Sequence, residues 1–149
     1  MSPESEEYMR IMAIDYGDAH TGIAVSDPTG LLAGFTATID AYHPEAAADR
    51  IAALAAEHGA EELVLGHPVN MDGTLGPRSQ RAHTMRALLE ERTGLPVVLW
   101  DERRTTIDAH QILMNSGKNA KKRKKTVDAV AASLILEGYL TYKKSHPQG

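Results

Sequence analysis

The chain has 149 residues, with 16 Lys plus Arg against 20 Asp plus Glu and no cysteine. This length fits one domain, and 42% hydrophobic with 24% charged residues excludes disordered, collagenous and coiled-coil chains. The absence of cysteine excludes disulfide scaffolds, thiolate zinc sites and cysteine nucleophiles. No run approaches the ~18 apolar residues of a membrane helix, and the acidic start has no signal-peptide character. These features predict a cytoplasmic protein without a membrane partner.

The hydrophobic pattern predicts three short strands followed by alternating helices and strands. Strands are expected at 10–15, 21–26, 31–39, 62–66 and 97–100. Helices are expected at 44–57, 77–92, 105 to about 115 and 126 to about 142, with prolines in the first turns of the first two and threonine N-caps on the last two.

This order of elements predicts the α/β class. The expected architecture is a mixed five-stranded sheet, in which a three-strand antiparallel meander precedes parallel strands, with helices on both faces. One domain is expected over residues 10–142, preceded by a disordered segment at 1–9 and followed by a tail at 143–149.

The positive charge is concentrated in one segment, which is expected to be a loop at 116–125. Outside it, 10 basic groups face 20 acidic ones, so a strongly cationic segment lies on an acidic body. This pattern indicates a local contact site for phosphate groups, and a solvated charge run without a function is the alternative. The six cations are Lys118, Lys121, Lys122, Arg123, Lys124 and Lys125.

Acidic residues fall where three predicted elements begin or end. Asp15 ends the first strand, Asp101 and Glu102 end the last one, and Asp128 is expected in the first turn of the final helix. If the first, fourth and fifth strands are parallel neighbours, their carboxyl ends face one crevice, where α/β sheets bind ligands. Converging carboxylates need a counter-cation or raised pKa values, and ligands that are all oxygen favour Mg²⁺ or Mn²⁺.

Each acid alone also has an ordinary structural interpretation. Asp15 alone is typical of a turn residue, and Asp128 alone would favour the positive end of its helix. Asp101 or Glu102 could form a surface salt bridge with Arg103. Their joint placement at one predicted edge of the sheet is what favours a functional site.

Four motifs occur together in an informative order. They are Asp-Tyr-Gly at 15–17 with Gly-Ile-Ala-Val-Ser-Asp at 22–27, Gly-His-Pro-Val-Asn-Met-Asp-Gly-Thr at 66–74, Asp-Glu-Arg-Arg-Thr-Thr at 101–106, and a Lys-rich run before Asp-Ala-Val-Ala-Ala at 128–132. In this combination the chain resembles the YqgF family, bacterial RNase H-like nucleases related to Holliday junction resolvases. The resemblance implies an RNase H-like fold and maturation of the 5′ end of pre-16S rRNA.

The resemblance also implies roles for individual residues. Asp15, Glu102 and Asp128 match the catalytic acids of the family, with Asp101 as the alternative to Glu102. Hydrolysis would then use two Mg²⁺ or Mn²⁺ ions roughly 4 Å apart. Asp15 would bridge them, and Glu102 and Asp128 would each complete one shell.

Nucleic acid is expected to contact two regions beside these acids. The basic segment would bind backbone phosphates. The polar loop after the fourth strand precedes a helix, whose N-terminal amides favour phosphate. Further contacts are expected from Asn70, Thr74, Arg78, Arg81 and Arg103. The implied partners are pre-rRNA or branched DNA, with ribosomal particles, for a monomer or a weak dimer.

Three positions depart from residues that the family often has. His20 replaces an arginine and would contact phosphate only when protonated, and Arg104 replaces a leucine. His67, also in place of a leucine, is interpreted as a loop residue beside a proline and not as a metal ligand. Trp100, in an apolar strand, is expected in the core and not as a base-stacking platform.

Rival functions stay open. The first motif also resembles the phosphate loop of actin-like ATPases, but those bind nucleotide between two such domains and have no place for the later motifs. The acids could be turn residues in a non-catalytic nucleic-acid or ribosome-binding module. A nuclease on branched DNA is the third alternative, and symmetric cleavage of a four-way junction would require a dimer.

Overall fold

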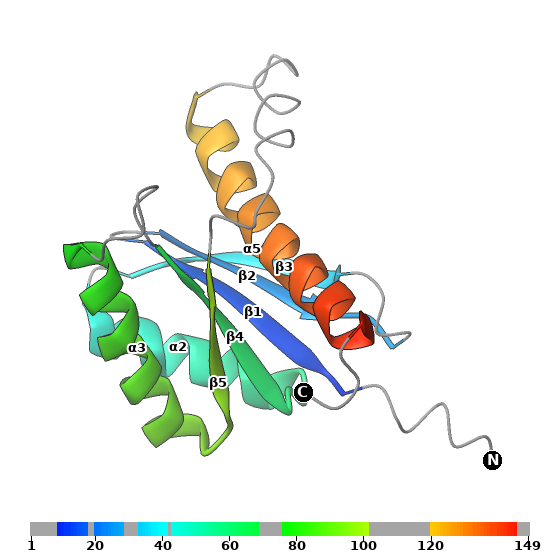
Figure 1. The fold of residues 1–149 in the computed structure, drawn as a ribbon. Coiled ribbons are helices and arrows are strands. Elements are labelled where there is room, and N and C mark those ends of the chain that lie inside the picture. The colour runs from blue at the N-terminus through cyan, green and yellow to red at the C-terminus, as the bar shows by residue number, and fades with distance from the viewer. Residues whose placement is uncertain are drawn as a thin grey trace.

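The computed structural model describes residues 9–17, 20–28, 33–41, 43–68, 76–101 and 120–145, with the backbone alone at 120–128 and 145. Within these ranges five strands and three helices follow one another (Figure 1). They are β1 (Ile11–Tyr16), β2 (His20–Ser26), β3 (Ala33–Asp40), α2 (Pro44–Glu57), β4 (Glu62–His67), α3 (Pro77–Thr93), β5 (Val97–Asp101) and α5 (Ala120–Ser145). The expected strands and the first two helices are confirmed, whereas the helix predicted from residue 105 lies outside the described residues.

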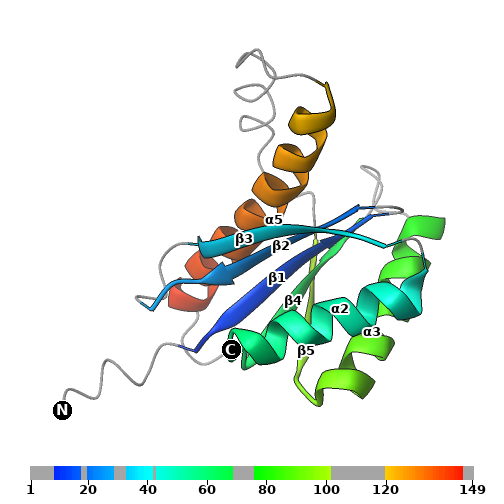
Figure 2. The same cartoon turned by 180° about the vertical axis from the view of Figure 1, so that it is seen from behind.

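The strands form one mixed sheet in the order β3-β2-β1-β4-β5. The first three strands pair antiparallel as a meander, and β1, β4 and β5 pair parallel. Helices α2 and α3 cover one face of this sheet and α5 covers the other (Figures 1 and 2). The predicted α/β architecture with helices on both faces is therefore confirmed. In the described part of the chain, no helix is both long and apolar enough to cross a membrane.

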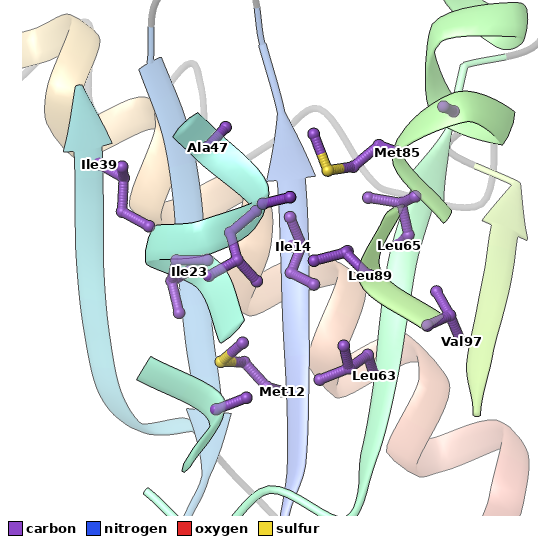
Figure 3. Close-up of a cluster of buried hydrophobic side chains, with 14 of the residues drawn as sticks. Met12, Ile14, Ile23, Ile39, Ala47, Leu63, Leu65, Met85, Leu89 and Val97 are labelled. Carbon is purple, nitrogen blue, oxygen red and sulfur yellow. The ribbon is translucent and has the colours of Figure 1, made fainter. Parts of the chain in front are cut away.

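Side chains alternate between the two faces along β1, which divides the core in two. Met12 and Ile14 belong to the cluster under α2 and α3, and Figure 3 shows Ile14 beside Leu89 of α3. Ile11 and Ala13 belong to the cluster under α5. On the α2/α3 side the strands contribute large aliphatic residues and the helices contribute alanines, whereas on the α5 side alanines lie on both the strands and the helix. Trp100, predicted in the core, is only 7% exposed and belongs to the α5 cluster.

Helix α5 begins earlier than the sequence pattern predicts. Its backbone is helical from Ala120, so the expected loop at 116–125 is wrong for residues 120–125, and Thr126 is not an N-cap. The physical reason is that lysine, arginine and alanine favour helix, and no glycine or proline interrupts the sequence before Gly138. Asp128 therefore lies eight residues after the first helical residue, not in the first turn.

A buried carboxylate ties the C-terminal end of α5 to the sheet. Glu62, at the start of β4, is 8% exposed and accepts hydrogen bonds from the Tyr139 hydroxyl at 3.0 Å and the Lys143 ammonium at 3.1 Å. Burial, followed by the negative charge of Glu62, raises the pKa of Tyr139 above its ordinary value. Two donors thus compensate a charge that would otherwise be expensive to bury.

Tyr139→Phe should lower the free energy of unfolding by about 1.5–3 kcal/mol near neutral pH, because it removes a hydrogen bond to a charged acceptor. As the pH rises past about 10, the unfolded wild type loses the Tyr139 proton before the folded state does, so this contribution disappears. Urea unfolding at neutral pH and at about pH 11 should show the gap between wild type and variant closing. Tyr142→Phe, at a more exposed position on α5, is the control, and a gap that stays constant with pH would contradict the prediction.

Candidate active site

The carboxyl ends of β1, β4 and β5 meet at one edge of the sheet. Asp15 is the penultimate residue of β1, and Asp101 is the last residue of β5. Strand β4 lies between them and pairs with both in parallel, as expected. This edge is where α/β sheets bind ligands, so it is the candidate active site.

Asp15 lies on the α5 face of the sheet. It continues the row of Ile11 and Ala13, which pack under α5, and its side chain is half-buried. Its register partner on β2 is Gly22, which has no side chain. The carboxylate therefore emerges between the sheet and α5, with no side chain at the paired position on β2.

Asp101 lies on the opposite face. Trp100 precedes it and packs in the α5 cluster, so alternation along β5 directs Asp101 to the α3 side. Its register partner there is His67, the last residue of β4. The structure thus brings Asp15 and Asp101 to one edge of the sheet but separates them by face.

Helix α5 presents a regular stripe to the sheet. Ala132, Ile135, Leu136, Tyr139 and Leu140 are buried, at the spacing of one helix face. Position 128 is four residues before Ala132, so it belongs to the same stripe. The first turns of α5, which contain residues 121–125 of the basic segment, extend beyond the sheet (Figure 1).

His67 is not the loop residue that the sequence suggested, because it ends β4 and faces α3. Its Nε2 is hydrogen-bonded to the Ser79 hydroxyl at 2.6 Å, and its ring meets the His83 ring edge-on with centroids 5.0 Å apart. Burial and the neighbouring His83 lower the pKa of His67, while Asp101 acts in the opposite direction. The imidazole is therefore neutral at and above neutral pH.

A crevice opens at this edge between β1, β4 and the first turns of α3. The residues that line it are Tyr16, Gly66, Pro68, Arg78, Arg81 and Ala82. The Arg81 guanidinium lies 5.9 Å from the centre of the Tyr16 ring, in a cation–π contact. Helix α3 starts with Gly76 as its N-cap residue, without a side-chain cap, and has no acid in its first turn. The crevice is thus cationic and suited to an anion.

His20, at the start of β2, contributes less positive charge to the carboxyl edge of the sheet than an arginine would. It lies on the same face as Gly22, and its Nδ1 is 2.6 Å from the Asp40 carboxylate on β3. The Arg50 guanidinium donates to the Asp40 carbonyl at 3.2 Å. The carboxylate beside His20 partly cancels any charge on its ring.

Among the described side chains, no group of three or more histidines and acids forms a metal-binding cluster. Of the predicted ligands, Asp15 alone has a described side chain, and for Asp128 the structure gives the backbone only. Outside the described residues, or described without side chains, are Glu102, Arg103, Asn70, Thr74, Lys118, Lys121, Lys122, Arg123, Lys124 and Lys125.

The sequence analysis missed two residues of this edge. Tyr16 was overlooked although it directly follows Asp15, and strand alternation alone would have assigned it to the face opposite Asp15. Ser79 was overlooked because a serine near a helix start usually signals a cap, whereas this one is 1% exposed and bonded to His67.

The sequence is similar to one protein family over almost its whole length. The profile of the RuvX family, described as Holliday junction resolvase, matches residues 9–142. The "Putative pre-16S rRNA nuclease" of Halothermothrix orenii is 42% identical over 135 residues, covering 91% of this chain and 96% of the relative. The protein of the same name from Listeria monocytogenes serotype 4b is 43% identical over 134 residues, covering 89% and 97%.

The fold is similar to that of T. thermophilus RuvC, solved in complex with a Holliday junction substrate. The TM-score is 0.61 at 14% identity, with 92% of this chain and 96% of RuvC covered. At this identity the similarity concerns the fold, and it confirms the expected RNase H-like architecture. Together with the family profile and the relatives, it confirms the resemblance found in the sequence: the chain belongs to the RuvX (YqgF) family.

Proposed function

We propose that this protein is a divalent-metal-dependent endonuclease that hydrolyses phosphodiester bonds at the carboxyl edge of its sheet, and that it processes the 5′ end of pre-16S rRNA. The observation that carries this proposal is that Asp15 and the stripe of α5 that includes position 128 face each other. The names of the relatives support the choice of substrate.

Asp15 and Asp128 are also expected at a similar height along the sheet. Tyr139 is bonded to Glu62, which is the register partner of Ile11. From Tyr139 back to position 128 the helix rises roughly 16 Å, and from Ile11 to Asp15 the strand extends roughly 13 Å. Helix α5 runs from the carboxyl edge toward the amino ends of β1 and β4, so the two lengths point the same way (Figure 1).

The second acid is better assigned to Glu102 than to Asp101. Asp101 faces α3 and has His67 as its register partner, on the side of the sheet away from Asp15. This separation argues against Asp101 as a ligand in a site on the α5 face. It supports Glu102 as the partner of Asp15 and Asp128.

The donor set fits a hard divalent cation. Asp15 is half-buried beside a glycine, the other predicted ligands are carboxylates, and the chain has no cysteine. Mg²⁺ or Mn²⁺ held by Asp15, Glu102 and Asp128 would supply neutralisation of phosphate charge and activation of water.

The remaining residues would bind and orient the substrate. Arg78 and Arg81 line the crevice next to Tyr16, where guanidinium groups can pair with phosphate oxygens. The basic first turns of α5 lie on the other side of the acidic site and would track a neighbouring stretch of backbone. Cations on both sides of Asp15 would hold the scissile phosphate over the carboxylates.

Cleavage of branched DNA is the second candidate, because the family profile is described as Holliday junction resolvase. Symmetric resolution of a junction needs two active sites in a dimer. Sedimentation gives the oligomeric state, and incubation with a four-way junction or with pre-16S RNA shows which substrate is cleaved. A monomer that cleaves only RNA favours rRNA processing, and a dimer that cuts the junction symmetrically favours resolution.

Asp15→Asn should lower RNA cleavage in Mn²⁺ or Mg²⁺ by about a hundredfold or more, because the bridging carboxylate is lost. Cleavage of a labelled pre-16S 5′ fragment measures this, with circular dichroism to verify folding. Glu57→Gln removes one exposed charge at the C-terminal end of α2 and is the matched control, expected to cleave normally. Equal cleavage by wild type and Asp15→Asn would remove Asp15 from the mechanism, and no cleavage by wild type would favour the non-catalytic binding module.

Glu102→Gln should reduce cleavage as strongly as Asp15→Asn, whereas Asp101→Asn should cost less than about tenfold. The reason is the opposite face that Asp101 occupies. Initial rates across a Mn²⁺ titration measure both variants, since loss of a ligand also raises the metal concentration needed. A collapse of activity in Asp101→Asn with Glu102→Gln unaffected would reverse the assignment.

Replacing Lys121, Lys122, Lys124 and Lys125 with glutamine should flatten the salt dependence of RNA binding. Each phosphate contact on a single strand contributes about 0.7 to the slope of log K against log salt. Fluorescence anisotropy with the Asp15→Asn background measures binding without cleavage. Lys144→Gln, an exposed cation at the far end of α5, is the control, and an unchanged slope in the fourfold variant would make the segment a solvated charge run.

A further inference from the structure

One hydrogen bond joins the end of β4 to the first turn of α3, across the loop between them. His67 Nε2 and Ser79 Oγ are 2.6 Å apart, although the residues are twelve positions apart in the chain. Ser79 is 1% exposed, so its hydroxyl has no access to bulk water. The bond is part-buried, with its serine end closed to solvent.

The His67 ring is held from more than one direction. The edge-on contact with His83, one turn further along α3, restricts rotation of the imidazole. His67 also belongs to the sheet through its backbone, opposite Asp101 on β5. The ring thus connects a rigid strand to two successive turns of α3.

The start of α3 has Pro77 in its first turn but no hydrogen bond from a capping side chain. Its N-cap residue, Gly76, offers no side chain, and no acid in the first turn compensates the positive end of the helix. Arg78 and Arg81 instead add positive charge at this end, which opposes the helix dipole. Ser79 lies between these two arginines in the sequence, and its hydrogen bond with His67 anchors the turn that presents them.

The same turn forms one wall of the crevice. Arg78 and Arg81 line it together with Gly66 and Pro68, the residues on either side of His67, and Arg81 lies over Tyr16. A shift of the first turn of α3 relative to β4 would therefore displace both arginines in the crevice and move Arg81 away from Tyr16, whose neighbour in sequence is Asp15.

We propose that His67 is a positioning residue: its hydrogen bond to Ser79 sets the first turn of α3 so that Arg78 and Arg81 present their guanidinium groups to a substrate phosphate in the crevice. This role rests on the proposed nuclease function and adds to it the residue that aligns the phosphate contacts. His67 itself touches neither the reacting atoms nor the substrate.

The test compares variants that break and keep the bond. His67→Leu removes it, and His67→Gln keeps a polar side chain able to bond the Ser79 hydroxyl. With a labelled pre-16S 5′ RNA, His67→Leu should raise KM about tenfold with kcat within about twofold, and His67→Gln should recover most of the loss. The Kd for the same RNA, measured in the Asp15→Asn background, should rise with KM.

The route through arginine is tested by a double-mutant cycle. If His67 acts by positioning the two arginines, then His67→Leu in an Arg78→Gln/Arg81→Gln background should add little to the KM increase of Arg78→Gln/Arg81→Gln alone. Ser79→Ala breaks the same bond from the other side and should reproduce the effect of His67→Leu. It also serves in place of His67→Leu should that variant fail to fold.

Thr93→Val is the matched control. Thr93 donates to the Leu89 carbonyl at 2.7 Å, so this variant removes a half-buried hydrogen bond from the opposite end of α3. It should lower stability without changing KM. Lower stability with unchanged KM and Kd in both His67→Leu and Ser79→Ala would overturn the positioning role, whereas a wild type that neither binds nor cleaves RNA would instead refute the proposed function.

Discussion

Close packing of α5 against the sheet is the constraint on which the candidate site depends. Small side chains make it possible: Ala13, Ala24 and Ala132 are all fully buried between the helix and strands β1 and β2. Alanine at these positions lets the backbone of α5 approach those of β1 and β2. Small residues therefore determine how closely the helix lies to the face of the sheet that carries Asp15.

At the carboxyl edge, the two faces of the sheet carry different residues. Asp15 emerges toward α5, whereas its neighbour Tyr16 packs on the α3 side under Arg81. Strand alternation alone produces this division, since consecutive residues point to opposite faces. At this edge Asp15 therefore lies on the α5 face, whereas Asp101 and the arginines of the crevice, Arg78 and Arg81, lie on the α3 side.

Much of the fold could be predicted because buried elements require apolar residues at regular positions in the sequence, as in the apolar runs of β1 and β4. The start of α5 could not, because its first turns consist of polar residues with no apolar period, and the cationic run at 121–125 is equally compatible with a loop. The site was predicted as a set of acids at strand ends. That Asp15 and Asp101 lie on opposite faces follows only from the register of Asp101 opposite His67. The hydrogen bond between His67 and Ser79 depends on tertiary packing that no local pattern encodes.

The buried carboxylate at the other end of α5 has a consequence for this arrangement. An axial slip of α5 to its nearest alternative packing would move the helix by one turn, about 5.4 Å. Such a slip would strip Glu62 of Tyr139 and Lys143 and leave an uncompensated charge in the interior, at a cost of several kcal/mol. The contacts of Glu62 with Tyr139 and Lys143 therefore fix the axial position of α5. They also fix the height of position 128, eleven residues before Tyr139.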